Sequence, residues 1–150
     1  MDTRLSEIDF IHFISNEIRS DDTIFDPVRK RFVNAFPEEL VRQSMIHAMQ
    51  FFYQIPFSRM AIEREIIVFQ KPRRFDILVY DKQGEPYILI ECKAPEIKLS
   101  QAILDQLSIY NFALKAPYAC IFNGRMSKAM HFNFNEKSYT LIDKLPNYPF

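Results

Sequence analysis

Two carboxylates and a lysine fall within or at the end of two apolar stretches, and residues of these types could perform metal-dependent chemistry. Asp76 lies in the middle of one apolar run, which we expect to be a strand, and Glu91 and Lys93 lie at the end of the next one. Because side chains alternate along a strand, Glu91 and Lys93 would share one face, whereas Cys92 would point the other way. If the two runs pair as a hairpin, Asp76 comes close to Glu91.

Converging carboxylates with no basic group between them would form a hard-oxygen site that suits Mg²⁺ or Mn²⁺. A metal ion held by Asp76 and Glu91 could activate water and offset the charge of a phosphate under attack. Lys93 could position or deprotonate that water, or stabilise the developing charge. The alternative interpretation is a solvated rim of charges. The apolar surroundings favour the metal site, because charge there is costly unless it is paired or bound to metal.

A polar pair also falls within the second apolar helix that we expect. Gln106 lies in its apolar stripe and one turn before Tyr110, so the two side chains can reach the same point. A buried amide needs hydrogen-bond partners. The alternative for Gln106 is that its amide only satisfies backbone groups.

The elements that must position these residues follow from apolar periodicity and turn residues. We expect a helix or strand at 5–20, two short strands within 23–33, a helix at 37–53, strands at 62–69, 73–81 and 86–93, a helix at 99–115, a strand at 118–123, and a hairpin of 127–134 and 137–142. Pro37 suits a first helical position, and the polar turn at 82–85 predicts an antiparallel hairpin. This order indicates an α+β fold with a mixed sheet.

Composition narrows the classes of protein. The chain of 150 residues predicts a single domain with a real core, and its formal net charge of zero argues against a strongly basic DNA-binding protein. Cys92 and Cys120 predict neither a disulfide framework nor a zinc site. We see no signal peptide and no apolar run of about 18 residues, so we expect a cytoplasmic protein with no membrane partner.

The motifs resemble those of nucleases. The set of Asp76, Glu91 and Lys93 is similar to the PD-(D/E)xK signature, with Phe75 in place of its proline, and 106–110 resembles the Q-x3-Y motif of RecB-like nucleases. More closely, four segments look like the N-terminal domain of type I restriction enzyme R subunits: IFDPVRK (24–30), PEELVRQ (37–43), RRFDILVYD (73–81) and IECKAP (90–95). The resemblance covers about 24–145 and leaves 1–23 as an N-terminal extension.

This resemblance implies a restriction-endonuclease-like core in αβββαβ order, with a mixed four-stranded central sheet, flanking helices and extra strands at both ends. It implies that Asp76 and Glu91 bind the metal, that the Cys92 carbonyl joins them, and that Lys93 is the catalytic lysine. It also implies that Gln106 and Tyr110 line the site and contact the DNA backbone.

Glu39 matches the helix glutamate that often completes such sites. Glu38 competes for that role, and Glu39 could instead form an i, i+3 ion pair with Arg42. Basic residues beside the site, Arg73, Arg74 and Lys98 among them, could form a rim for DNA phosphates or simply be scattered solvated charges.

Three hypotheses follow. The first is an Mg²⁺-dependent endonuclease that hydrolyses DNA phosphodiester bonds. The second is a non-catalytic DNA-binding or accessory domain of the same fold, which needs a protein partner or a second copy. The third is a structural domain with a coincidental motif. The sequence has no Gly-x4-Gly-Lys-Ser/Thr phosphate loop, so we expect no ATP-driven activity from it.

Overall fold

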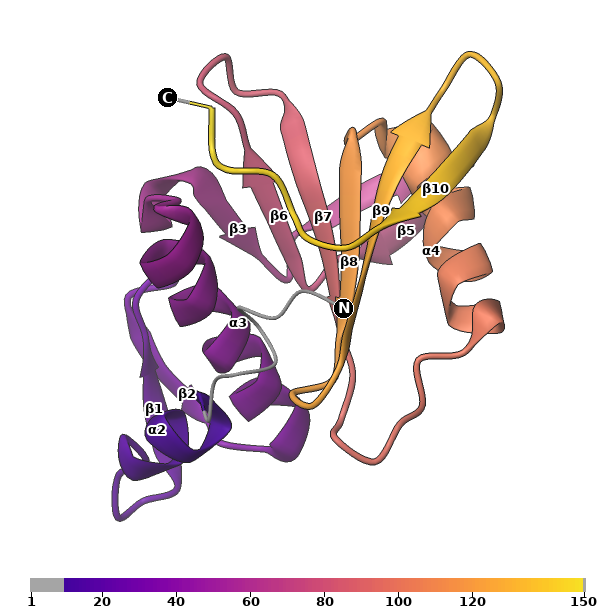
Figure 1. The fold of residues 1–150 in the computed structure, drawn as a ribbon. Coiled ribbons are helices and arrows are strands. Elements are labelled where there is room, and N and C mark those ends of the chain that lie inside the picture. Colours follow the sequence, from indigo (N-terminus) through magenta and orange to yellow (C-terminus); the bar gives the residue numbers. More distant parts are fainter. Residues whose placement is uncertain (1–9, 150) are drawn as a thin grey trace.

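A mixed sheet forms the centre of the protein in the computed structural model, which describes residues 10–149 (Figure 1). Its strand order is β10-β9-β8-β7-β6-β3, with β7 and β8 parallel and the other neighbours antiparallel. The strands are β3 (Met60–Ile62), β6 (Ile77–Tyr80), β7 (Pro86–Cys92), β8 (Tyr118–Phe122), β9 (Ser127–Asn133) and β10 (Ser138–Ile142). The predicted α+β class with a mixed sheet is confirmed.

Helices cover both faces of this sheet. The helix α3 (Pro37–Tyr53) shares one buried cluster with Ile77 and Ile90, and α4 (Gln101–Leu114) shares the other with Leu78 and Leu89 (Figure 1). Because neighbouring strand residues point to opposite faces, a strand covered on both sides is apolar throughout. When only strands of this sheet are counted, the order α3, β3, β6, β7, α4, β8 follows the expected helix–three strands–helix–strand sequence.

The helix α3 begins and ends where the sequence predicts. Pro37 occupies its first turn, and Glu38 and Glu39 lie at its positive end. The N-cap Phe36 makes no side-chain capping bond, and Gln54 ends the helix in the left-handed conformation with φ 57°.

The helix α4 begins slightly later than predicted, because Ser100 caps it by accepting a hydrogen bond from the Ile103 N–H. Its buried residues are Leu104, Leu107, Ser108 and Asn111. The helix therefore buries a different face from the predicted apolar stripe, which contained Gln106. Gln106 is exposed, which corrects the expectation that its amide is buried.

The predicted strands at 62–69 and 73–81 each divide into two. The residues next to the connecting turn form a separate two-stranded sheet of β4 (Glu65–Val68) and β5 (Lys71–Arg74). The residues farther from that turn belong to the main sheet, as the end of β3 and the whole of β6. The division follows from Glu63, whose φ of 51° breaks the extended backbone. Asp76 therefore lies at this break, directly before β6, and the expectation that it lies in the middle of a strand was wrong.

The N-terminal part contains the expected pair of short strands, β1 (Thr23–Asp26) and β2 (Arg31–Asn34), which pair antiparallel. Before them, α2 (Phe10–Asn16) settles the choice between helix and strand for that part of 5–20, and 5–9 lie outside the described residues. A short 3-10 helix, η1 (Phe57–Arg59), leads into β3. Within residues 10–149, no helix is long and apolar enough to cross a membrane.

Candidate active site

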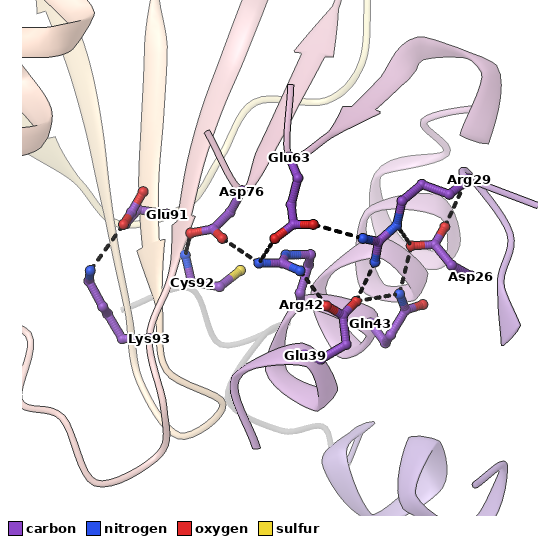
Figure 2. Close-up of polar contacts among 10 residues, drawn as sticks. All are labelled: Asp26, Arg29, Glu39, Arg42, Gln43, Glu63, Asp76, Glu91, Cys92 and Lys93. Carbon is purple, nitrogen blue, oxygen red and sulfur yellow. Dashed lines mark hydrogen bonds and ion pairs between the residues drawn. The ribbon is translucent and has the colours of Figure 1, made fainter. Parts of the chain in front are cut away.

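The β6–β7 hairpin brings Asp76 next to Glu91. Its register pairs Ile77 with Ile90, so the next residues outward, Asp76 and Glu91, face each other. Asp76 Oδ2 accepts a hydrogen bond of 2.8 Å from the Cys92 N–H. Figure 2 shows Asp76 between Glu91 on one side and α3 on the other. The turn at 82–85 thus places the two carboxylates together, as the sequence predicts.

Lys93 completes this cluster on the same strand. Its Nζ lies 3.0 Å from Glu91 Oε1 (Figure 2), while Cys92 between them is fully buried in the core on the α3 side. Cys92 and Cys120 are both free thiols. The alternation along β7 therefore places Glu91 and Lys93 on one face and Cys92 on the other, as expected.

Burial and mutual repulsion perturb the Glu91 carboxyl. Burial, and next the negative charge of Asp76, raise the pKa of Glu91 to about 7, although Lys93 opposes both effects. Burial alone would lower the pKa of Lys93, but the charges of Glu91 and Asp76 raise it. The Glu91 carboxyl is therefore protonated more readily than usual despite the Lys93 ammonium, and a bound divalent cation would relieve the repulsion between the two carboxylates.

Arg42 is a partner of Asp76 that the sequence analysis did not anticipate. Its Nη2 donates a hydrogen bond of 2.7 Å to Asp76 Oδ1, and the arginine is almost completely buried. Burial would lower the pKa of Arg42, but hydrogen bonding to Asp76 and the charge of Glu39 raise it, so the guanidinium stays charged. The sequence analysis expected no basic group between the two carboxylates, and Arg42 reaches Asp76 from the α3 side, away from Glu91 (Figure 2).

Glu39 belongs to the same ionic cluster. Its carboxylate accepts hydrogen bonds from the guanidinium groups of Arg29 and Arg42 and, at 3.0 Å, from Gln43 Nε2. The i, i+3 ion pair with Arg42 that the spacing allowed is present. The two arginines hold Glu39 on the side of Asp76 that lies away from Glu91 (Figure 2).

Glu38, the competing helix glutamate, interacts electrostatically with Asp76 and Lys93. Burial raises the pKa of the Glu38 carboxyl, the charge of Asp76 raises it further, and Lys93 lowers it. Its side chain is otherwise exposed to solvent. Of the two glutamates in the first turn of α3, Glu38 therefore feels the charges of the site, and Glu39 is neutralised by arginines.

Arg29 links this cluster to the β1–β2 turn. Its guanidinium bonds Asp26 Oδ2 at 2.7 Å, Glu63 Oε2 at 3.0 Å and Glu39. Burial raises the pKa of Asp26, but hydrogen bonds from the Arg29 N–H and guanidinium and from Gln43 outweigh it and lower that pKa. The sequence analysis did not identify these partners of Arg29. The Asp-Pro turn before it was the one available signal.

A cleft of about 300 Å³ opens beside the carboxylates on the α4 side. It is lined by Pro72, Arg73, Arg74, Phe75, Glu91, Lys93, Ile103, Gln106, Leu107 and Tyr110. Gln106 Nε2 donates a hydrogen bond of 3.3 Å to the Tyr110 hydroxyl, and the Arg73 guanidinium lies 5.3 Å from the centre of the Tyr110 ring. Because it is exposed at this cleft, the Gln106 amide can reach a ligand without the internal partners that a buried amide needs.

The structure separates Lys98 from the other predicted DNA-contacting residues. Arg73 and Arg74 line the cleft with Glu91, whereas Lys98 lines a second depression together with Arg125. The loop after β7 carries Lys98 away from the carboxylates. A nucleic acid that touched all three basic residues would therefore extend beyond the cleft.

Few oxygen donors beside the cleft are available to a divalent cation. The described residues contain no group of three His, Cys, Asp or Glu side chains placed to hold a metal. Two carboxylates remain, together with the Cys92 carbonyl, which points to the Asp76 side because the N–H and C=O of one strand residue face the same neighbour. Mg²⁺ accepts few protein oxygens and keeps several waters, so these residues fit it.

The fold and this cluster define an α+β protein with adjacent carboxylates and a lysine at the ends of two inner strands of a mixed sheet. Comparison with known families is more specific. The family model for the type I restriction enzyme R protein N terminus matches residues 37–146, and the chain belongs to that family. No curated protein matches the chain. The family suspected from the motifs is confirmed, and it associates the chain with restriction of DNA.

Proposed function

We propose that the chain is a metal-dependent endonuclease domain that hydrolyses DNA phosphodiester bonds. The observation that carries this proposal is the pairing of Asp76 with Glu91, with Lys93 3.0 Å from Glu91, at the edge of the cleft. Buried carboxylates at such close range are costly unless a cation compensates them. Membership of a restriction enzyme family makes DNA the expected substrate.

Asp76 and Glu91 would hold Mg²⁺ or Mn²⁺ with the Cys92 carbonyl. Bound there, the ion would supply an activated water and offset charge on the phosphate. Arg42 and the Cys92 N–H fix the Asp76 carboxylate, so it needs little reorganisation to act as a ligand. A carboxylate has about four lone-pair positions, which leaves room for a cation beside these two hydrogen bonds.

Lys93 would stabilise negative charge on the phosphate. The charges of Glu91 and Asp76 raise its pKa, so the ammonium group keeps its proton at neutral pH. This supports an electrostatic role for Lys93 over the role of a general base, and both were open from the sequence. Gln106 and Tyr110, at the opposite wall of the cleft, would contact the DNA backbone.

DNA phosphates would lie along a basic rim. Arg73 and Arg74 line the cleft, and Lys98 would extend the contact beyond it. Glu39 would act through Arg42 rather than at the metal, and Glu38 is the helix carboxylate that is coupled to the site.

A second candidate function is a non-catalytic DNA-binding or accessory domain that needs a protein partner or another copy of the chain. The ion pair between Arg42 and Asp76 favours it, because an arginine already neutralises one proposed ligand. The formal net charge of zero also favours it, because weak attraction to DNA would require help from a partner.

Calorimetric titration of Mn²⁺ and Mg²⁺ separates the two candidates. The wild type should bind the metal, Asp76→Ala should lose binding, and Glu136→Ala, which removes an exposed carboxylate in the β9–β10 turn, should bind normally. Nicking of supercoiled DNA should follow the same pattern. Metal binding by Asp76→Ala at wild-type affinity would refute the site, and metal binding without nicking would support the accessory domain.

A further inference from the structure

The β4–β5 hairpin ends in a strained turn. Its two central residues, Phe69 and Gln70, have φ angles of 51° and 64°. Two consecutive positive values define a turn that Asn and Gly normally occupy, because a Cβ atom is crowded in that conformation. A bulky residue held there costs on the order of 1 kcal/mol or more. The sequence therefore places a phenylalanine where glycine would be more stable.

The Phe69 ring is exposed although the hairpin itself is anchored. Phe69 is 66% exposed and Ile67 is 68% exposed, whereas Val68 between them is 3% exposed and packs in the core beside α4. Ile66 packs against the same core. The hairpin is thus fixed by one face and presents apolar side chains on the other, which is typical of a binding surface.

Positive charge is concentrated on the same hairpin. The segment 64–74 carries four basic residues and one acidic residue, in a chain whose formal net charge is zero. All residues of β5 are exposed, including Lys71, Arg73 and Arg74. The register pairs Lys71 with Val68 and Arg73 with Ile66 on the anchored face, and Arg74 with Glu65 on the other face. An exposed aromatic ring at the tip of a basic hairpin matches single-stranded nucleic acid, whose bases stack and whose phosphates attract cations.

The hairpin also forms one wall of the candidate active site. Arg73 and Arg74 line the cleft with Glu91, and the Arg73 guanidinium packs over the Tyr110 ring. The strand β5 extends from Arg74 to Lys71, about 10 Å at about 3.3 Å per residue, and the turn that contains Phe69 adjoins its Lys71 end. A strand whose backbone follows β5 would therefore pass from the cleft to the aromatic tip.

We propose that the β4–β5 hairpin is a nucleic-acid-binding arm whose Phe69 ring stacks on an unpaired base of a single DNA strand leading to the cleft. The inference rests on the proposed function, because that function makes DNA the ligand of the cleft. A duplex covers the faces of its bases, whereas a single strand offers them to an exposed ring. The left-handed turn holds the ring outward, away from the Val68 anchor.

Fluorescence anisotropy with a labelled oligothymidine, without divalent metal so that no cleavage occurs, tests the arm. Phe69→Gly should weaken single-strand binding by on the order of tenfold and raise the melting temperature, because glycine relieves the strained turn. Phe69→Tyr should retain binding. Phe51→Ala, which truncates a phenylalanine of similar exposure, 69%, at the end of α3, should change neither affinity nor the response to salt.

Three results would contradict the proposal that the hairpin binds a single DNA strand. They are unchanged single-strand affinity in Phe69→Gly, an equal loss of affinity for a duplex of the same length, and a wild-type dimer that Phe69→Gly dissociates in sedimentation. Metal calorimetry and plasmid nicking test the proposed function separately. If the chain binds metal and nicks DNA normally, but Phe69→Gly binds single-stranded DNA as the wild type does, only the proposal about the hairpin is rejected. If Phe69→Gly weakens binding to single-stranded DNA but the wild type binds no metal, only the proposed nuclease function is rejected.

Discussion

Arg42 Nη2 lies 2.7 Å from Asp76 Oδ1, so a buried arginine of α3 holds a carboxylate that would bind metal on the adjacent hairpin. The same guanidinium bonds Glu39, and its Nη2 is 3.3 Å from Glu63 Oε1. This one side chain therefore compensates three carboxylates from three parts of the chain. The candidate site and the core around α3 are coupled through it.

We expect Arg42→Ala to destabilise the fold strongly. Removing one partner of a buried ion pair typically costs 3–5 kcal/mol, since the remaining charges are left uncompensated. Urea unfolding measures the loss, and it should be smaller in saturating Mg²⁺ if the ion binds beside Asp76. Arg125→Ala, at an exposed arginine, is the control and should change the free energy of unfolding by less than about 0.5 kcal/mol. An equal effect of both substitutions would contradict the structural role of Arg42.

Glu91→Gln should increase stability and abolish metal binding. The folded-state pKa of Glu91 is about 7, above its ordinary value of 4.5, so the folded chain retains a proton that the unfolded chain has lost. Wild-type stability should therefore fall as the pH rises from about 4.5 to 7, by up to about 3 kcal/mol. Glu91→Gln should flatten this part of the pH profile, as measured by urea unfolding at each pH. A profile of unchanged slope in Glu91→Gln would show that another group causes it.

Lys93→Ala should lose DNA cleavage and retain both the fold and metal binding. A side chain that stabilises charge in the transition state typically contributes about 10²–10³ to the rate. The plasmid-nicking rate measures the loss, with circular dichroism and metal calorimetry as checks on fold and site. Lys144→Ala, at an exposed lysine near the C-terminus, should nick at the wild-type rate. Full activity in a folded Lys93→Ala protein would refute the mechanism.

The basic rim should appear in the salt dependence of DNA binding. Loss of one phosphate contact lowers the slope of log K against log salt by about 0.9 for duplex DNA. We expect this from Arg73→Ala, Arg74→Ala and Lys98→Ala, measured by anisotropy over a salt series. Lys144→Ala again serves as the control. If Lys98→Ala leaves the slope unchanged, the DNA is confined to the cleft that Arg73 and Arg74 line.

Local signals in the sequence determined much of the fold and the central pair of the site. Pro37 and two following glutamates marked the start of α3, because these residues act on the first turn alone. The turn at 82–85 made β6 and β7 neighbours, so the approach of Asp76 to Glu91 followed from alternation and register. Such features depend on residues close together in the chain, and spacing reveals them.

Tertiary structure alone decided which groups surround that pair. Arg42 reaches Asp76 across 34 positions of sequence, and Arg29 reaches Glu63 across another 34. Gln106 is exposed because the packing of α4 buries Leu107 and Ser108 instead. The packing of α3, the β1–β2 turn and the sheet against one another determines which groups pair with the buried charges. The sequence determined which groups could titrate or bind metal, and packing decided how each charge is compensated.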